Sequence, residues 1–373
     1  MIGALKNWTD QFLGRGGASI TVPVLDGALK SNQMLEDAEV FAQLKAPEDL
    51  ATDGDSVFVA DGMRVLRYDA LADGGAAAEA ARFDRPVTAL ACLAGGGLAV
   101  ALDGREVRIA GGPHDGRRWE GADGRAFLSV NAIGAASAGR ILITEGSRTQ
   151  PQERWKHDLM ERGHSGRAIE LTLASGAVRE IAGGLAYAFG ACLAGSGPDA
   201  EIWVCESWRH RVVQCGGARS GRAVLDGLPG YPSRIAPSPG GGYWLTAFTL
   251  RTQLVEFVLR EPAFRKRMMR EIEPEYWVSP ALNSGNHVLE PLQAAQLRTM
   301  GVVKPWAPPR SYGLVIRLSP EGLVRYSLHS RFDGKHHGVV AAVECRGRLF
   351  VLAKGCQRVL RLTVADAERS LQA

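Results

Sequence analysis

One pattern recurs along most of this chain: a short apolar run, a turn that contains glycine, and a second apolar run. Its clearest copy spans residues 311–329, where two strand-like segments flank the turn Pro320-Glu321-Gly322. Alternating apolar residues on both sides of a glycine turn predict a β-hairpin. Repetition of one hairpin-rich unit predicts a radial or solenoid β architecture.

Six such units can be counted, each opening with a short apolar strand. These opening strands are 47–51, 87–90, 130–133, 188–192, 233–236 and 339–343. The sixth unit has no outer strand of its own, whereas 39–44 is a spare strand near the N-terminus. Pairing the two would close a ring and remove exposed sheet edges. We therefore predict an all-β fold, a six-bladed β-propeller whose N-terminal strand closes the last blade.

No linker divides the chain, so we expect a single domain over residues 1–373, with 1–37 as an N-terminal extension. Two insertions interrupt the repeat, one at 145–166 in the third unit and one at 251–310 in the fifth. The second contains a predicted helix around 262–273. Long excursions from a compact β fold usually cap a site or dock a partner, so we expect a partly helical lid. Solvated surface decoration is the alternative.

The composition argues against several classes of partner. The 44 basic and 40 acidic residues give a net charge of only +4 and are scattered, so we expect no nucleic-acid binding. No stretch is long and apolar enough for a membrane span, and the first residues lack the pattern of a secretory signal, which favours a cytoplasmic location. The six cysteines form no CxxC pair, which argues against a zinc site. The oligomeric state cannot be read from the sequence.

Four local segments resemble the strictosidine synthase-like family, which is itself similar to gluconolactonases and paraoxonases. The segments are 26–29, 166–171, 228–232 and 326–329, and the resemblance covers nearly the whole chain. It implies a pocket at one end of the central channel, lined by the first residues of each blade's innermost strand. It also implies a small-molecule substrate.

In metal-dependent relatives, the resemblance implies that Glu, Asn and Asp oxygens at these positions bind calcium or another divalent cation. Glu48 matches the glutamate and Asn131 one asparagine, but Phe189 replaces another asparagine and Ser233-Arg234 replaces an Asp-Asn pair. A phenyl ring cannot coordinate a cation, and a guanidinium repels one. We therefore predict no axial metal and no cofactor, with Arg234 pairing with Glu48 across the channel mouth. The alternative is that Arg234 turns outward to solvent.

The resemblance also places a catalytic glutamate of the plant strictosidine synthases at the position of Val340, so we do not expect strictosidine synthesis in this protein. His337 directly precedes the sixth blade's inner strand, at the expected channel mouth. Because an imidazole exchanges protons near neutral pH, His337 is a candidate base, with an ordinary surface position as the alternative. Tyr231, Phe189 and Trp244 are expected to form an aromatic wall, although Trp244 could instead pack between blades.

These observations favour a small-molecule hydrolase that acts on a lactone or related ester. Glu48 or His337 would activate water, and Arg234 would stabilise the oxyanion. The expected substrate contacts are Asn131, Phe189, Tyr231, Ser233 and Trp244. The alternative is a non-catalytic propeller that binds a metabolite or a protein partner.

Overall fold

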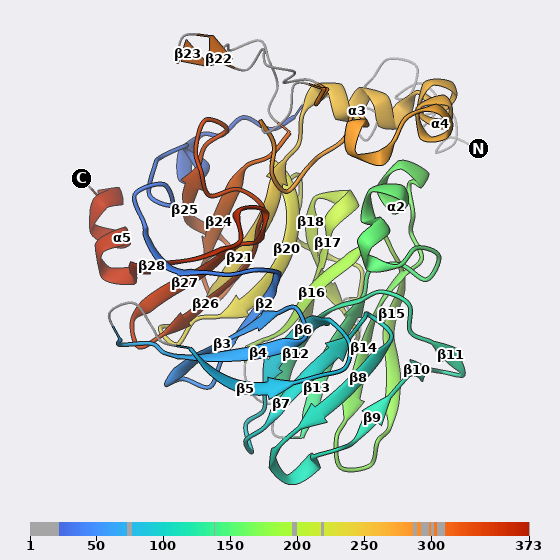
Figure 1. Ribbon diagram of the computed structural model, residues 1–373, viewed down its shortest axis with the longest axis vertical. Coiled ribbons are helices and arrows are strands. Elements are labelled where there is room, and N and C mark those ends of the chain that lie inside the picture. The colour runs from blue at the N-terminus through green and yellow to red at the C-terminus, as the bar shows by residue number, and fades with distance from the viewer. Residues whose placement is uncertain are drawn as a thin grey trace.

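The computed structural model describes residues 22–72, 77–137, 139–195, 200–217, 220–285, 289–291, 298–299, 302–303 and 310–372. Its main feature is a ring of six antiparallel sheets of four strands each (Figure 1). The expected N-terminal extension falls mostly outside the described residues, as does part of the 251–310 insertion.

Each sheet forms one blade, and its strands follow one another from the channel outward. Blades 1 and 2 consist of β2 (Pro47–Thr52), β3 (Ser56–Asp61), β4 (Arg64–Asp69) and β5 (Ala78–Arg82), then β6 (Val87–Cys92), β7 (Leu98–Leu102), β8 (Glu106–Ala110) and β9 (Arg118–Trp119). Blades 3 and 4 consist of β12 (Val130–Ser137), β13 (Arg140–Glu145), β14 (Gly166–Thr172) and β15 (Val178–Leu185), then β16 (Ala188–Ala194), β17 (Glu201–Glu206), β18 (Arg211–Cys215) and β19 (Ala223–Leu225). Blades 5 and 6 consist of β20 (Gly230–Pro237), β21 (Tyr243–Leu250), β24 (Gly313–Leu318) and β25 (Val324–Ser330), then β26 (Val339–Cys345), β27 (Arg348–Ala353), β28 (Arg358–Thr363) and β1 (Glu39–Gln43). Two short ribbons lie outside the blades, β10 (Gly121–Ala122) with β11 (Arg125–Ala126), and β22 (Arg298–Thr299) with β23 (Val302–Val303).

The ring is closed by the strand that the sequence identified. β1 pairs antiparallel with β28, with Glu39 opposite Arg361. Arg361 donates two hydrogen bonds of 2.9 Å to the Glu39 carboxylate and lies 4.9 Å from the centre of the Phe41 ring. The six inner strands contact one another in the order β2, β6, β12, β16, β20, β26 and back to β2. The predicted six-bladed propeller is therefore confirmed.

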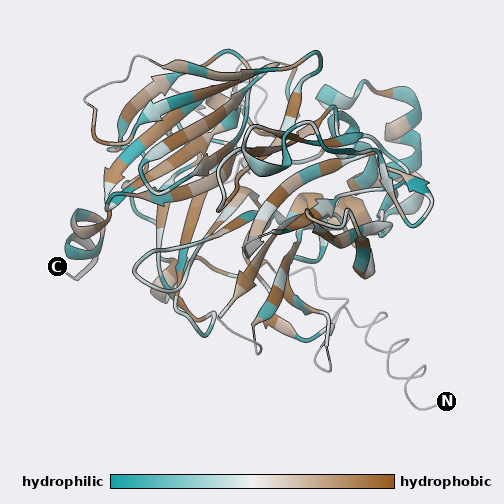
Figure 2. Cartoon of the chain, turned by 90° about the horizontal axis from the view of Figure 1, so that it is seen from below, coloured by the Kyte–Doolittle hydropathy of each residue, from teal (hydrophilic) through white to brown (hydrophobic). Residues whose placement is uncertain are grey.

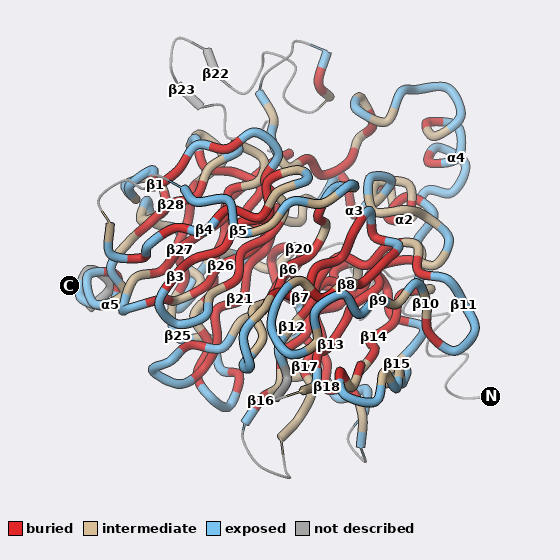
Figure 3. Tube along the Cα trace, turned by 60° about the horizontal axis from the view of Figure 1, so that its bottom comes forward, coloured by how far each residue is buried: buried red, intermediate tan, exposed pale blue. Residues whose placement is uncertain are grey.

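The blades bury their faces against one another, so the strands near the channel are buried on both faces. Every residue of β3 and of β7 is buried, whereas β5 at the outer edge is largely exposed. Figure 3 shows this gradient from buried strands near the channel to exposed outer edges, and Figure 2 shows the apolar residues gathered along the strands. The core is thus a set of apolar layers between neighbouring blades.

Three blades share a buried clasp between a carboxylate at the end of the second strand and the arginine opposite it on the third. The pairs are Asp61 with Arg64 (3.0 Å), Glu145 with Arg167 (2.6 Å) and Glu206 with Arg211 (2.6 Å). Each carboxylate also accepts a backbone N–H from the loop that enters its blade, at Ala46, Leu128 and Ala186 respectively. Hydrogen bonds within an ion pair offset much of the free energy that it costs to remove the two charges from water. These clasps therefore hold the start of the inner strand in place in three of the blades.

The two insertions meet over one end of the channel. The third-blade insertion contains the 3-10 turn η4 (Gln152–Arg154) and α2 (Trp155–Glu161), and the fifth-blade insertion contains α3 (Gln253–Arg260) and α4 (Pro262–Glu271). α4 confirms the helix expected around 262–273, whereas α3 was not anticipated. α2 lies beside α4 and contacts it (Figure 1). The ring of His157 on α2 lies edge-on to the ring of Trp277, which is fully buried, with the ring centres 4.7 Å apart.

The remaining helical segments are short or terminal. They are η2 (Gly27–Leu29), η3 (Gly112–His114), η6 (Ser207–Arg209), η7 (Pro274–Tyr276), η8 (Lys354–Cys356) and α5 (Val364–Gln372). Among the residues that the structure describes, no helix is both long enough and apolar enough to span a membrane.

Candidate functional site

A local irregularity at the start of every inner strand positions the side chains of the channel mouth. The pairing of each inner strand with its neighbour shifts register within the first residues, for example between Pro47 and Asp49 and between Val339 and Ala341. The residues at or within these shifts are Glu48, Thr88, Asn131, Phe189, Ser233, Arg234 and Val340. A β-bulge re-aims a side chain away from the regular alternation of a strand. These irregularities therefore set which side chains at the start of the inner strands reach the cavity, and four of them do: Glu48, Thr88, Phe189 and Val340.

A cavity of ≈ 360 Å³ lies at this end of the channel. Five aromatic residues form one part of its wall: Trp155, Tyr187, Phe189, Trp208 and Phe248. The rings contact one another, since Tyr187 stacks on Trp208 at 4.3 Å and Trp155 lies edge-on to Phe248 at 5.5 Å. Such a wall suits a flat or apolar small molecule.

The polar part of the cavity contains an ion pair and is also lined by Thr88, Asp103, Gln152 and Glu153. Lys354 Nζ lies 2.6 Å from Glu48 Oε1, and Gln152 Nε2 donates to the same oxygen at 2.8 Å. The Glu48 and Lys354 side chains are 18% and 27% exposed, so both reach the solvent-filled space. No described residue donates to Glu48 Oε2, and Gln152 Oε1 is buried without a hydrogen-bond partner among the described residues. The wall therefore presents one oxygen, Glu48 Oε2, that can accept a hydrogen bond from a ligand or water.

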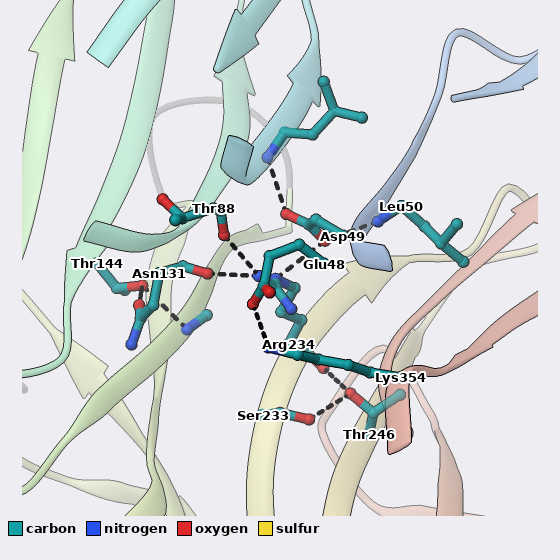
Figure 4. Close-up of polar contacts among 12 residues, drawn as sticks. Glu48, Asp49, Leu50, Thr88, Asn131, Thr144, Ser233, Arg234, Thr246 and Lys354 are labelled. Carbon is teal, nitrogen blue, oxygen red and sulfur yellow. Dashed lines mark hydrogen bonds and ion pairs between the residues drawn. The ribbon is translucent and has the colours of Figure 1, made fainter. Parts of the chain in front are cut away.

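A second ion pair lies beneath the first, between Arg234 and Asp49 (Figure 4). Arg234 Nε is 2.9 Å from Asp49 Oδ1, and Arg234 Nη2 donates to the carbonyl oxygens of Asn131 at 2.6 Å and Thr88 at 3.2 Å. The guanidinium also lies 4.9 Å from the centre of the Phe189 ring. Arg234 thus joins the inner strands of blades 1, 2, 3 and 4 to its own blade 5.

Asp49 is 1% exposed, and its surroundings act on its pKa in opposite directions. Burial raises the pKa to about 6, although Arg234 and the backbone N–H groups of Leu90 and Leu50 lower it. These N–H groups lie 2.9 Å and 2.8 Å from the carboxylate oxygens. Desolvation of the carboxylate is the largest effect because Asp49 is almost completely removed from solvent. Arg234 Nε makes an ion pair with this carboxylate but no hydrogen bond of good geometry.

The donor set does not fit a divalent cation. The Asn131 amide faces into its blade, where its Nδ2 donates to the carbonyl oxygen of Ala188 at 2.9 Å and its Oδ1 accepts from Thr144 Oγ1 at 2.8 Å. Glu48 is already paired with Lys354, and the guanidinium of Arg234 occupies the centre of the channel. Calcium and similar ions need several free oxygen ligands, so these residues are unsuited to hold one.

The sequence-predicted site residues separate into two layers. Glu48 and Phe189 line the cavity, and Arg234 and Asn131 lie beneath it. The predicted contact between Arg234 and Glu48 is wrong, because each side chain has a different partner of opposite charge. The alternative of an Arg234 turned to solvent is also wrong, since this residue is only 8% exposed.

Two of the predicted substrate contacts are packed within blade 5. Ser233 Oγ lies 2.7 Å from Thr246 Oγ1 on the neighbouring strand and is fully buried. Trp244 donates its indole N–H to Glu344 at 2.8 Å, which joins blades 5 and 6. Neither residue lines the cavity, so packing between blades accounts for Trp244.

Tyr231 and His337 also lie outside the cavity wall. Tyr231 is fully buried against His210, with ring centres 4.6 Å apart. His337 has both ring nitrogens engaged, Nδ1 with Ser311 Oγ at 2.7 Å and Nε2 with the Arg331 carbonyl oxygen at 2.7 Å. The choice of His337 as a base is therefore not supported by its position.

The functional residues that sequence reasoning missed come from loops between second and third strands. Lys354 begins η8 in blade 6, Trp208 lies in η6 of blade 4, and Gln152 and Trp155 come from the third-blade insertion. In a propeller these loops all reach the end of the channel where the inner strands begin. A charged or aromatic residue just after a second strand, as for Lys354 and Trp208, was the sequence signal that could have placed these two residues at the cavity.

The returning part of the fifth-blade insertion closes the cavity on the side of blade 6. Leu282 lines the cavity, and its carbonyl oxygen packs against the backbone of Gly338 and Gly355. A Cβ atom on Gly355 would overlap this carbonyl, so glycine is required there for the segment to sit so close.

Comparison with curated proteins identifies distant relatives. The human adipocyte plasma membrane-associated protein (Homo sapiens) is 26% identical over 349 residues, which span 82% of this chain and 73% of that protein. The Salmo salar protein of the same name is 26% identical over 229 residues, which span 59% of this chain and 46% of that protein. Protein strictosidine synthase-like 6 of Arabidopsis thaliana is 28% identical over 150 residues, or 39% of each chain. The matched regions thus cover less than half of the salmon and Arabidopsis proteins, and no protein-family model matches this chain.

Comparison with solved structures shows the fold. A putative gluconolactonase aligns with a TM-score of 0.52 at 13% identity and covers 90% of this chain and 96% of its own. A luciferin-regenerating enzyme aligns at 0.50 and 13% identity, covering 86% and 92%. Regucalcin from Agrobacterium tumefaciens, described as a calcium-binding protein, aligns at 0.50 and 12% identity, covering 87% and 92%.

These matches agree with the resemblance seen in the sequence. The chain is weakly homologous to strictosidine synthase-like 6 and to the adipocyte plasma membrane-associated proteins, and it shares its fold with the putative gluconolactonase.

Proposed function

We propose that this protein is a small-molecule hydrolase that opens a lactone or cleaves an ester without a bound metal ion. The observation that carries the proposal is the 2.6 Å pair of Glu48 and Lys354 in the wall of a cavity that five aromatic residues also line. The pair brings a proton acceptor and a fixed positive charge to one point. Hydrolysis of an acyl group needs both.

In the proposed reaction, Glu48 Oε2 accepts a proton from a water molecule as that water attacks the substrate carbonyl carbon. The Lys354 ammonium lies close enough to stabilise the negative charge that develops on the carbonyl oxygen. The C–O bond to the leaving alcohol then breaks, and the protonated Glu48 returns its proton to the alkoxide. A lactone would leave as a hydroxy acid, and an ester as an acid and an alcohol.

Arg234 has a different role in this proposal from the one expected from sequence. Its guanidinium lies beneath the cavity wall and holds Asp49 and two backbone carbonyls, so it supports the inner strands that carry Glu48 and Phe189. The oxyanion role therefore passes to Lys354. The names of two fold neighbours, gluconolactonase and luciferin-regenerating enzyme, are compatible with a small-molecule substrate. The cytoplasmic location stays a prediction, because several relatives are named plasma membrane-associated.

A second candidate is a non-catalytic propeller that binds a metabolite. The observation that favours it is the same ion pair, since Glu48 and Lys354 neutralise each other without any ligand present. In this case, the aromatic residues of the wall would provide most of the binding energy. Glu48 Oε2 would determine which ligands bind, by accepting a hydrogen bond from them.

A panel of lactones and aryl esters, assayed with EDTA present throughout, separates the two candidates. The hydrolase predicts turnover that survives EDTA and is lost in Lys354→Met. Lys266→Met is a matched control because Lys266 is exposed on α4. Saturable binding without turnover would support the binding protein, and turnover that disappears with EDTA would contradict the metal-free site.

A further inference from the structure

A groove of ≈ 760 Å³ lies at the outer strands of blade 5 and shares no lining residue with the aromatic cavity. Its walls are the segment 27–32, the turn at 240–241, the β24–β25 hairpin and Glu368 of α5. η2 contacts β25, and α5 contacts β28 of the neighbouring blade (Figure 1). Nothing in the proposed hydrolysis uses this groove.

The groove has more basic than acidic residues. Lys30, Arg317 and Arg325 line it, whereas Glu368 is the one carboxylate among the described residues of its wall. None of the three basic side chains forms an ion pair with a described carboxylate, and Glu368 forms none with a described basic residue. The wall therefore has a net positive charge that no ion pair among the described residues cancels.

Two further carboxylates lie close by, but each is held by another side chain. Glu344 accepts the indole N–H of Trp244 at 2.8 Å. Glu321 accepts from Ser319 Oγ at 2.7 Å, and this hydrogen bond is the main cause of its lowered pKa, with a smaller contribution from Arg325. Neither carboxylate lines the groove or forms an ion pair with the described basic residues of its wall.

Arg317 provides a positive charge in a fixed position. On β24 it lies opposite Trp244 of β21 and Tyr326 of β25, and its guanidinium is 4.9 Å from the centre of the Trp244 ring. It donates to the backbone carbonyl oxygens of Gly241 at 2.6 Å and Leu318 at 3.2 Å. Carbonyl groups carry no net charge, so they orient the guanidinium without cancelling its positive charge.

A turn of glycines makes this arrangement possible. Residues 240–242 are all glycine, and Gly241 and Gly242 have φ +86° and +73°. A Cβ atom on Gly242 would overlap the carbonyl oxygen of Leu318 and lie 3.0 Å from Arg317 Nη1. Because glycine lacks this atom and adopts such φ values readily, the turn can bring the Gly241 carbonyl to Arg317. It also places no side chain in the groove.

Lys30 and Arg325 line the groove from two other segments. The segment that carries Lys30 is held on β25, because Asn32 Nδ2 donates to the Ser327 carbonyl oxygen at 2.8 Å and Ser327 Oγ donates to the Ala28 carbonyl oxygen at 3.0 Å. The Lys30 and Arg325 side chains are both exposed, so they can reach a ligand in the groove.

The charge of the wall indicates the class of ligand. A phosphate monoester carries about 1.5 to 2 negative charges near pH 7, which matches the excess of three basic residues over one acidic residue. A carboxylate carries one. An arginine presents paired N–H donors to phosphate oxygens, and a lysine adds a compact positive charge. We propose that this groove binds a phosphate group, either inorganic phosphate or a small phosphate ester, through Arg317, Lys30 and Arg325.

Isothermal titration of the wild-type protein tests the ligand class. Inorganic phosphate, phenyl phosphate and acetate are each titrated near pH 7 at constant ionic strength. We expect saturable binding of at least one phosphate, with acetate at least about tenfold weaker. The tighter of the two phosphates distinguishes a free ion from an ester. Thermal unfolding in the same solutions should show a rise in melting temperature with that phosphate.

Matched variants test the residues. Lys30→Gln combined with Arg325→Gln is expected to weaken phosphate binding by about tenfold or more, because two charged contacts are lost. Both side chains are exposed, so the fold should be kept. Arg118→Gln combined with Arg125→Gln removes the same charge from two exposed arginines outside the groove and is expected to bind like wild type.

Three results would overturn the proposal: no saturable binding of either phosphate to wild type, acetate binding as tightly as phosphate, or equal affinity in the Lys30/Arg325 variant and wild type. The melting temperature of each variant without ligand shows whether it is folded. Phosphate binding and hydrolysis can fail separately, because the groove and the aromatic cavity have no lining residue in common.

Discussion

Glu48 and Asp49 are neighbours on one strand, yet their carboxylates have opposite surroundings. Glu48 reaches the cavity, pairs with Lys354 and keeps one oxygen free, whereas Asp49 is 1% exposed and pairs with Arg234 below the cavity. The bulge between Pro47 and Asp49 separates the two directions. The pair of Glu48 and Lys354, the outer pair, can therefore exchange partners with a ligand. The pair of Asp49 and Arg234, the inner pair, can only hold the ring of blades together.

The positive charge at the centre of the ring of blades belongs to the Arg234 side chain and does not require a metal ion. Arg234 contacts an acid from blade 1 and carbonyl oxygens from blades 2 and 3. Each of these three residues lies more than a hundred residues before Arg234 along the chain. One guanidinium thus provides several directed contacts to different blades, as a coordinated ion would, but through donors of fixed geometry. Chemistry then has to come from the outer pair.

The largest expected effect is on stability when the inner pair is broken. Arg234→Met leaves the Asp49 charge buried without its cation, which should lower the free energy of unfolding by about 3–5 kcal/mol. Lys354→Met breaks the outer pair, and the expected loss is below about 1 kcal/mol because both side chains reach solvent. Urea denaturation of the two variants checks this. Equal losses would mean that the two pairs do not differ in the way described.

The next effect is a pH dependence that belongs to the inner pair. The pKa of Asp49 is raised from 3.8 to about 6, with burial as the main cause, so between these values the folded protein binds a proton that the unfolded chain has released. Stability should therefore fall as pH rises through this window and level off above it. The difference in unfolding free energy between wild type and Asp49→Asn should decline by on the order of 2 kcal/mol from pH 3.8 to about 7. A flat difference, or one that grows with pH, would show that the charged form of Asp49 is not penalised.

A smaller effect should appear where the Leu282 segment closes the cavity that contains Glu48 and Lys354. Gly355→Ala places a Cβ against the Leu282 carbonyl and should push that segment away from the cavity, at a cost of about 1–3 kcal/mol. Gly240→Ala is the control, since a Cβ there meets only Ser238 Oγ at 3.8 Å. Limited proteolysis should cut the 251–310 insertion faster in the first variant alone. Identical cleavage patterns would argue that Leu282 is not anchored by this contact.

The smallest expected effect is that of calcium. Because Arg234 occupies the hub and Asn131 faces into its blade, millimolar calcium should leave the melting temperature unchanged. A saturable stabilisation by calcium that Asn131→Ala abolishes would restore a metal site at the channel.

The fold could be predicted because propeller blades repeat their pattern locally. Inner strands are buried on both faces and read as apolar runs between glycine turns, and β1 was recognisable as a strand without a partner. The outer strands β5, β9, β15 and β19 were missed because they lie at the outer edges of the blades, where burial imposes little apolar pattern, and because β9 and β19 are only two and three residues long. α3 was missed because the helical pattern of 253–260 is short and follows a strand directly.

The site could be predicted only in part. The start of each inner strand was identified correctly as the channel mouth, which placed Glu48, Asn131, Phe189 and Arg234. What the sequence could not supply was pairing over long separations. Lys354 is 306 residues from Glu48, and nothing local marks it as the partner. The choice between Glu48 and Asp49 as the partner of Arg234 depends on a bulge that shifts by one residue which side chain faces the cavity.

The most direct test of this account is the kcat/KM of Glu48→Gln against wild type, measured with EDTA on the best substrate of the ester and lactone panel. The account predicts a loss of about 10²- to 10⁴-fold, as expected when a general base is removed, with an unfolding free energy within about 1 kcal/mol of wild type. Full activity in Glu48→Gln would contradict it, because the outer carboxylate would then have no part in the chemistry.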